Sequence, residues 1–180
     1  MLREHEPVDA REAHHLKTLR ELLTNHAEPF ARDHYDPGHF TASAFVLAPD
    51  AQALLLIYHG KLKRWLQPGG HVEESDADLL AAARRELAEE TGLTDVHVRL
   101  SGCPLDVDVH RIPARASEAS HLHYDVRFLF QALTESASAA SDAEQVRWVR
   151  FDALDSVETD ESVRRAVRKI CDTLDPRNRD

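Results

Sequence analysis

The sequence predicts an α/β protein of the α+β type, in which helices cover a mixed β-sheet. Three segments repeat apolar residues at helical spacing, and the segments between them carry the continuous or alternating apolar runs typical of strands. The chain has 180 residues, a length that suits one domain with a terminal extension. We therefore expect an N-terminal helical extension over residues 1–35 and a main domain over residues 36–176.

The first predicted helix covers about residues 13–27, because leucines recur there three or four positions apart and Pro29 should end the helix. The second covers residues 78–91, whose sequence DLLAAARRELAEET is rich in the helix formers Ala and Leu. Gly92 suits the C-terminal cap of this helix. The third covers about residues 160–174, where apolar residues again recur at helical spacing.

Strands are predicted where apolar residues run together or alternate, at residues 41–47, 53–58, 95–100, 104–112, 121–133 and 145–151. After the second strand, Pro68-Gly69-Gly70 predicts an irregular turn. A basic cluster, Lys61, Lys63 and Arg64, precedes this turn and either contacts phosphates or forms a plain solvated loop. Trp65 either stacks on a base or packs in the core, and the core is the commoner place for tryptophan.

The composition argues against several classes of protein. The net charge is −10, so the overall field does not attract nucleic acid and we expect no nucleic-acid partner. No stretch approaches the ~20 apolar residues of a membrane helix, and residues 1–6 lack an apolar run, so we expect neither a membrane partner nor a signal peptide. Two cysteines far apart, Cys103 and Cys171, argue against a disulfide framework and indicate a cytoplasmic protein.

Three carboxylates lie together on the second predicted helix. Glu86, Glu89 and Glu90 stand at positions i, i+3 and i+4, which are neighbours on one helix face. Like charges at this spacing destabilise a helix, whereas a divalent cation would turn the repulsion into attraction. Three such glutamates by themselves are more often a solvated face than a metal site, so the surrounding sequence has to decide.

The surrounding sequence contains a glycine turn, Gly69-Gly70-His71-Val72-Glu73, and then the string Arg85-Glu86-Leu87-Ala88-Glu89-Glu90-Thr91-Gly92-Leu93. Over residues 69–93 the chain closely resembles the signature of the Nudix hydrolases. The resemblance implies a Nudix-type α/β/α sandwich with a mixed sheet. It also implies metal-dependent hydrolysis of the phosphoanhydride bond of a nucleoside diphosphate linked to another moiety X, with a small nucleotide as substrate.

The resemblance assigns roles to individual residues. Glu86, Glu89, Glu90 and the Gly69 carbonyl would bind Mg2+ or Mn2+. Arg85 would tie the loop to the helix, with Glu73 as one partner. Glu86 is the first choice of general base, followed by Glu118 and His121.

The chain departs from the family signature at one point. The family has an acid six residues after the glycine and eight residues before the arginine. Counting forward from Gly70 gives Asp76, whereas counting back from Arg85 gives Ala77. The loop therefore carries one extra residue, and the geometry of Asp76 is open.

Two further predicted strands alternate polar with apolar residues. Asp106, Asp108 and His110 lie on one face of the first, and His121, His123 and Asp125 lie on one face of the second. If the strands pair, the six side chains share a face that is either a solvent-facing sheet or a wall of the substrate cleft. Zinc binding by His121 and His123 is a weaker option, because no cysteine completes a structural site. The candidates for substrate binding are Arg64, Glu73, Asp108, His110, His121 and His123.

Two rival functions remain at this point. One is a nucleotide-binding regulator of the same fold without catalysis, and the other is an isoprenoid diphosphate isomerase, for which Cys103 and the histidines would be required. The signature glutamates Glu86, Glu89 and Glu90, hereafter the box carboxylates, are all present, which argues against both. The sequence leaves open the nucleotide, the formation of a homodimer, and whether the N-terminal helix acts as lid, dimer contact or cover.

Overall fold

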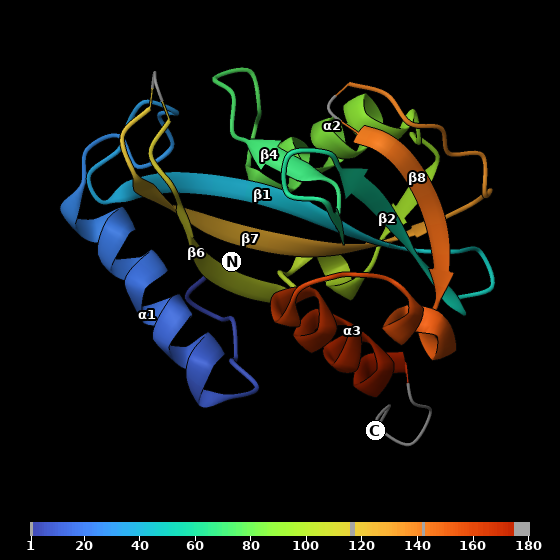
Figure 1. Ribbon diagram of the computed structural model, residues 1–180. Coiled ribbons are helices and arrows are strands. Elements are labelled where there is room, and N and C mark those ends of the chain that lie inside the picture. The colour runs from blue at the N-terminus through green and yellow to red at the C-terminus, as the bar shows by residue number, and fades with distance from the viewer. Residues whose placement is uncertain (1, 116–117, 142, 175–180) are drawn as a thin grey trace.

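The computed structural model of the protein describes residues 2–115, 118–141 and 143–174, and Figure 1 shows a mixed sheet with helices on either side. The predicted end of the main domain at residue 176 lies outside these residues. The elements in chain order are α1 (Ala10–Asn25), β1 (Gly38–Leu47), β2 (Ala53–His59), β3 (Arg64–Leu66), β4 (Gly69–His71), α2 (Leu79–Thr91), β5 (Val96–Val98), β6 (Asp106–Ile112), β7 (His121–Ala132), β8 (Ala143–Arg150) and α3 (Glu161–Leu174). The predicted fold class is confirmed.

Helix α1 begins three residues before the predicted start, because Asp9 caps it. The Asp9 side chain accepts a hydrogen bond from the Glu12 N–H (2.7 Å), which satisfies one of the free donors of the first turn. The helix ends at Asn25, two residues earlier than predicted, and the His26 N–H still bonds to the Leu22 carbonyl (3.2 Å). Its leucine stripe is buried against the sheet, as helical spacing predicts.

The sheet is built around β1 and β7, which run parallel with His39 opposite His123 and Ser43 opposite Arg127. The far edge of β7 carries β6 and β5, both antiparallel. The other edge of β1 carries β4 and the start of β2, and β2 pairs in turn with β3 and β8. Strands β3 and β4 were not predicted, because the Pro68-Gly69-Gly70 sequence indicates a turn. In the structure Gly69–His71 extends for three residues along Thr41–Ser43 of β1.

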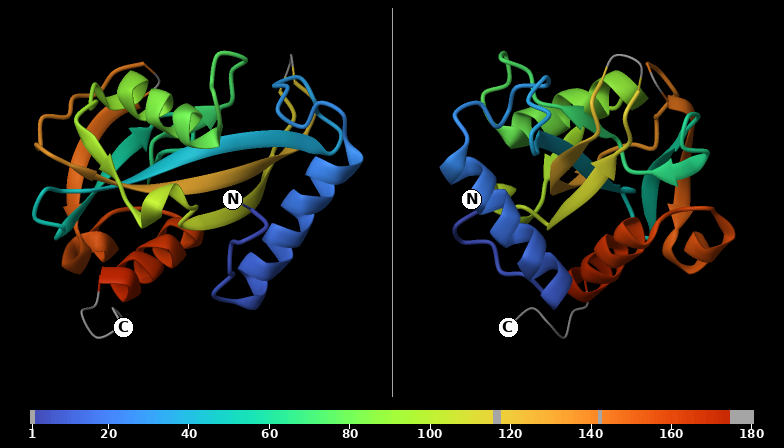
Figure 2. Two further views of the ribbon diagram at one scale, coloured as in Figure 1. Left: turned by 180° about the vertical axis from the view of Figure 1, so that it is seen from behind. Right: turned by 60° about the vertical axis from the view of Figure 1, so that its left-hand side comes forward.

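The two faces of the sheet form two apolar layers because side chains alternate along each strand. Phe40, Ala42 and Ala44 of β1 point to the layer that also contains apolar residues of α1 and α2. Phe45 and Leu47 point to the layer that contains α3. Figure 2 shows α2 and α3 on opposite sides of the sheet, with α1 reaching down to α3. None of the described helices combines the length and apolar character needed to cross a bilayer.

Helix α1 covers the outer edge of the sheet at β6. The Val109 N–H of this edge strand donates to the His15 Nδ1 atom (3.3 Å), so part of the edge is closed to other strands. Lys169 of α3 donates to the Glu12 carboxylate (2.6 Å) and joins the two helices. Helix α1 therefore belongs to the same packed core as the sheet, and the division at residue 35 stays a prediction.

Candidate active site

Helix α2 places the three glutamates at the border of a buried face. The helix starts after Asp78, whose side chain accepts from the Ala81 N–H (2.8 Å), and it ends at Gly92, which adopts the left-handed conformation (φ 67°). Its buried apolar face is made of Ala82, Ala83 and Leu87. Along the border, Glu89 is exposed, Glu86 is half-buried and Glu90 is buried.

The glycine turn packs directly against two of these glutamates. The Gly69 N–H donates to the Glu90 Oε2 atom (2.9 Å). At Gly70, an added Cβ atom would lie only 2.5 Å from the Glu86 Oε1 atom, closer than real contacts allow. A side chain at residue 70 would therefore displace the Glu86 carboxylate, so glycine is needed here for close approach.

Arg85 lies at the centre of the polar contacts between the loop and the helix. Its Nη1 atom donates to Glu86 Oε1 (3.0 Å) and Glu89 Oε2 (3.1 Å). Its Nη2 atom donates to the His71 carbonyl (2.8 Å) and to Asp76 Oδ2 (3.0 Å). One guanidinium thus holds β4, the loop and two of the box carboxylates in fixed relation.

The loop acid that pairs with Arg85 is Asp76, despite the extra residue. Its two oxygens accept from the Arg85 Nε (3.1 Å) and Nη2 (3.0 Å) atoms, and hydrogen bonding by Arg85 lowers the pKa of Asp76. Asp76 is also held by a local turn, in which the Glu73 N–H donates to its Oδ2 atom (2.9 Å). Glu73, the partner suggested by the sequence, approaches Arg85 only to 3.8 Å.

Glu86 has the electrostatic setting of a proton acceptor. Burial raises the pKa of Glu86, and the neighbouring Glu89 and Glu73 raise it further, while Arg85 opposes the rise. A carboxylate whose pKa moves toward neutrality is a better base near pH 7 than an exposed glutamate. The carboxylates present fit Mg2+ or Mn2+, since hard cations take oxygen ligands and the buried Glu90 lies against Gly69 beside Glu86.

The polar residues of β6 and β7 share one face, as the alternation predicts. The strands are antiparallel, with Asp108 opposite Asp125 and His110 opposite His123. The face is not solvent-exposed at its carboxylates, because Asp106, Asp108 and Asp125 are at most 2% exposed. The alternative of a solvent-facing sheet is therefore wrong for this part of the face.

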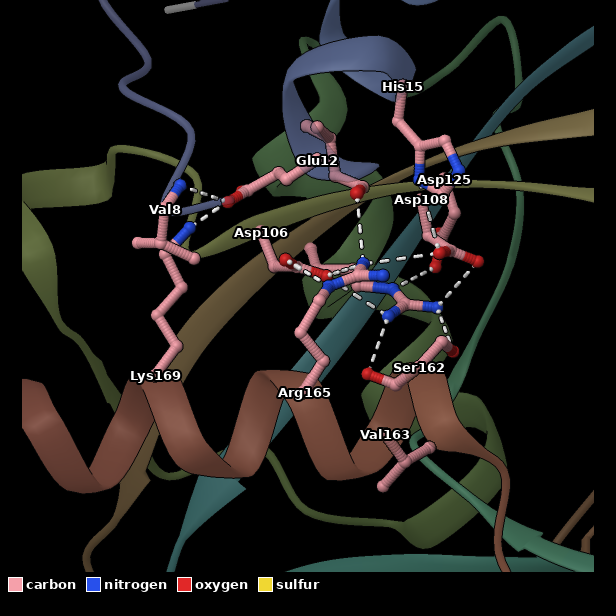
Figure 3. A network of polar contacts seen from close by, with 12 residues as sticks. Val8, Glu12, His15, Asp106, Asp108, Asp125, Ser162, Val163, Arg165 and Lys169 are labelled. Carbon is pink, nitrogen blue, oxygen red and sulfur yellow. Dashed lines mark hydrogen bonds and ion pairs between the residues drawn. The ribbon is translucent and has the colours of Figure 1, made fainter. Parts of the chain in front are cut away.

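Two buried arginines bind these carboxylates, as the close view in Figure 3 shows for Arg165. Arg127 donates to Asp125 (2.8 Å) and Asp106 (3.1 Å), and Arg165 donates to Asp106 (2.7 Å) and Asp108 (3.1 Å). Burial alone would lower the pKa of Arg127, but the three carboxylates raise it above its usual value. The predicted contact of Asp108 with substrate stays a prediction, one that this burial does not favour.

The sequence reasoning missed these arginines. A signal was present in β7. Arg127 lies two residues after Asp125, so both side chains are on the same face of the strand, and Arg127 is opposite Asp106 of β6. No comparable signal marks Arg165, because α3 is far from β6 in sequence and only packing brings them together.

Of the remaining predicted residues, His121 lies beside His123, with ring centroids 5.1 Å apart, whereas Arg64 and Trp65 lie on β3. Arg64 starts β3 with an exposed side chain, opposite His59 of β2. His121 is 3% exposed and its Nδ1 atom lies 2.7 Å from the Ala119 carbonyl. Glu118 forms an isolated bridge with Arg115 in the loop between β6 and β7. Trp65 is half-buried beside Tyr58, with ring centroids 5.5 Å apart.

A hollow of about 720 Å3 adjoins the loop end of the box. One wall is formed by Leu23 of α1 and by residues 26–33, which follow this helix. The other wall is formed by His71, the last residue of β4, and by residues 72–74. Phe30 offers a partly exposed aromatic surface there (39%), and Arg32 offers a cation. The segment after α1 thus forms one wall of the space next to Glu73 and His71.

The chain is similar to known proteins in sequence and in fold. A family model described as the NUDIX domain matches residues 37–170. A probable DHNTP pyrophosphohydrolase of Lactococcus lactis subsp. cremoris (strain MG1363) is 35% identical over 102 residues, which are 56% of this chain and 58% of that protein. The matched region therefore spans less than two thirds of the relative's length.

Solved structures share the fold. A C. elegans Ap4A hydrolase has a TM-score of 0.60 at 16% identity, with 75% of this chain and 96% of that chain covered. The E. coli dihydroneopterin triphosphate pyrophosphohydrolase has a TM-score of 0.55 at 15% identity, covering 72% and 92%. The family match and the name of the relative agree with the predicted enzyme class, a hydrolase acting on phosphoanhydride bonds. The family model matches well over half of the residues of this chain, and the chain therefore belongs to the Nudix family.

Proposed function

We propose that this protein hydrolyses the phosphoanhydride bond of a nucleoside diphosphate linked to another moiety, with Mg2+ or Mn2+ as cofactor. The observation that carries the proposal is the packing of the Gly69-Gly70 turn against Glu86 and Glu90, with Arg85 joining the turn, the loop and the helix. This arrangement places the carboxylates of Glu86 and Glu90 beside a backbone segment that carries no side chain. Relatives named as pyrophosphohydrolases support the same reaction class.

In this proposal Glu86, Glu89, Glu90 and the Gly69 carbonyl would hold the metal. When bound, the metal would neutralise the charge of the diphosphate and lower the pKa of bound water. Glu86 accepts a proton from the attacking water at Oε2, since Oε1 already receives the Arg85 hydrogen bond. Arg85 positions Glu86 and Glu89, and Asp76 positions Arg85 in turn.

The hollow beside the box is our candidate site for the non-reacting part of the substrate. Phe30 can stack on a flat ring, and Arg32 can offset the repulsion that a chain of net charge −10 exerts on phosphates. Names of relatives suggest substrates to include in a screen, namely dihydroneopterin triphosphate and Ap4A. Nucleoside triphosphates, nucleotide sugars and ADP-ribose complete the set.

The test is a Mg2+-dependent screen of these compounds, with products identified by mass spectrometry. New phosphate ends support hydrolysis, an unchanged but bound ligand indicates a regulator, and a shifted double bond in an isoprenoid diphosphate indicates an isomerase. On the substrate found, Glu89→Gln and Glu90→Gln should each lower kcat at least ~100-fold, about 2.7 kcal/mol of barrier.

Glu21→Gln is the matched control, because it removes an exposed carboxylate from α1, outside the box. It should leave kcat unchanged, and circular dichroism should show that all three variants keep the fold. Near wild-type turnover in both box variants would reject the assignment of the metal ligands.

A further inference from the structure

Three histidines from three different strands converge beside the glycine turn. His39 lies in β1, His123 lies directly opposite it in β7, and His71 ends β4 on the other side of β1. Their ring centroids are 4.9 to 5.2 Å apart. The sheet topology alone brings them together, since they are far apart along the chain.

The histidines have the spacing of metal ligands. One ring nitrogen from each lies within 4.8 Å of the others, and among the described residues this is the only such group of three or more His, Cys, Asp or Glu side chains. Zinc bound at 2.0–2.1 Å by tetrahedral ligands places the nitrogens about 3.4 Å apart. Movements of the ring nitrogens by about 1 Å, through side-chain rotation, would bring all three into bonding distance of one ion.

Hydrogen bonding prepares the His39 ring to act as a ligand. Its Nδ1 atom lies 3.2 Å from the His34 carbonyl, to which it can donate only when it carries the proton. The Nε2 atom then holds a free lone pair, and a carbonyl contact of this kind is the usual second partner of a metal-bound histidine. Among the described residues, the Nε2 atoms of His39 and His123 have no hydrogen-bond partner, although both atoms are buried. The His39 residue as a whole is only 1% exposed.

Burial also favours the neutral form of the imidazole rings, which is the form that binds metal. Burial lowers the pKa of His39 and that of His123. The buried Nε2 atoms of His39 and His123, which lack hydrogen-bond partners, carry a polar cost that a bound cation would remove.

We propose that His39, His71 and His123 bind one transition-metal ion of the zinc class, at a site separate from the box carboxylates. Imidazole nitrogens suit zinc and related metals, whereas Mg2+ takes oxygen ligands, so the two sites select different ions. His71 also lines the hollow beside the box, which gives an ion a path to the site. Of the histidine pair that the sequence suggested for zinc, only His123 takes part.

The ion would fasten β4 to β1 and β7. Strand β4 is only three residues long, yet it carries Gly69, Gly70 and the His71 carbonyl that receives Arg85. A metal on the His71 ring would therefore stabilise the position of the glycine turn. The inference is independent of the reaction catalysed, because none of its ligands is a box carboxylate.

The test is a titration of chelator-stripped protein, purified without a histidine tag, with Co2+ and then Zn2+. We expect one Co2+ per chain with the strong visible absorption of a tetrahedral complex, displaced by one Zn2+, and a higher Tm with zinc bound. His71→Ala and His123→Phe should each weaken zinc binding at least about 100-fold. His97→Ala, which removes an exposed histidine from β5, should leave binding unchanged.

The same titration separates this site from the box. Glu89→Gln combined with Glu90→Gln should keep the tetrahedral cobalt spectrum even if it abolishes turnover. Absence of stoichiometric Co2+ binding in the wild type would overturn the proposal, whatever the variants do. So would a cobalt spectrum that persists in folded His71→Ala or that disappears in the double glutamate variant.

Discussion

The guanidinium of Arg85 and the carboxylate of Asp76 form a two-point hydrogen bond, from Nε to Oδ1 (3.1 Å) and from Nη2 to Oδ2 (3.0 Å). The pair is nine residues apart along the chain and spans the loop that leads into α2. Arg85 uses its third nitrogen for Glu86 and Glu89. The orientation of two box carboxylates therefore depends on an acid that lies outside the helix.

Asp76→Asn should lower kcat about tenfold, close to 1.4 kcal/mol of barrier. The amide can accept one hydrogen bond from Arg85 but loses the charge, and neutral bonds are roughly half as strong as charged ones. Steady-state kinetics on the substrate found by the screen measures the change. Asp152→Asn is the matched control, because it makes the same change at an exposed aspartate that pairs with Arg150 (3.4 Å), and its kcat should stay within about twofold. Equal effects of the two substitutions would contradict the positioning role of Asp76.

Alanine at the two glycines of the turn should have different consequences. At Gly70 the new Cβ would meet the Glu86 carboxylate (2.5 Å), a side-chain end that can move, so activity should fall while the Tm changes little. At Gly69 it would meet the Ala42 carbonyl (2.7 Å) of the β1 backbone, so the Tm itself should fall by several degrees. Thermal unfolding and kcat measured on both variants test the contrast. A large loss of Tm in Gly70→Ala would show that its neighbours cannot adjust.

Arg127→Met should cost about 3–5 kcal/mol of unfolding free energy, because it leaves Asp125 buried without its arginine partner and removes one of the two arginines that bind Asp106. Denaturant unfolding followed by circular dichroism gives the value. The control is Arg168→Ala, which removes an exposed ion pair with Glu161 and should cost less than about 1 kcal/mol. If the two substitutions had similar costs, the buried network would not be the structural element inferred here.

Stability should fall in acid partly through Glu12. Burial by itself raises the pKa of Glu12, but hydrogen bonds from His5, Lys169 and the Val8 N–H outweigh it and lower the pKa from 4.5 to about 2. A carboxylate with a lowered pKa in the folded state stabilises that state above its unfolded pKa. This contribution should therefore be present above pH 4.5 and disappear as the pH falls toward 2.

Unfolding free energies of the wild type and Glu12→Gln, measured at several pH values, check this expectation. The variant should be less stable near pH 6, and the difference should shrink toward pH 2. A difference that stayed constant with pH would mean that Glu12 contributes by packing and not by charge.

The site was predictable from the sequence to the extent that its chemistry is local. Glu86, Glu89 and Glu90 share a helix face because of helical spacing alone, and Arg85 follows from the same string. The pairing of Asp76 with Arg85 was open, since a loop with one extra residue can present either neighbour to the helix. The turn that Glu73 and Asp76 form in the structure decides it.

The residues that the sequence placed poorly depend on distant partners. Alternation correctly put six polar side chains of β6 and β7 on one face, but it could not show whether that face was covered. Arg127 and Arg165, from β7 and α3, turn three of the carboxylates into a buried network. In the same way, His123 meets His39 and His71 only because β1 pairs with both β7 and β4.

The sequence by itself thus determined the fold class, the helix that carries the glutamates, and the family. Each of these depends on spacing within about 25 residues, where helical and strand geometry relate position to direction. The tertiary structure alone decided which polar side chains are buried, which of them neutralise one another, and which histidines meet. Those outcomes depend on strand pairing and helix packing between segments distant in the chain, and burial is what gives their charges and unpaired nitrogens a large energetic effect.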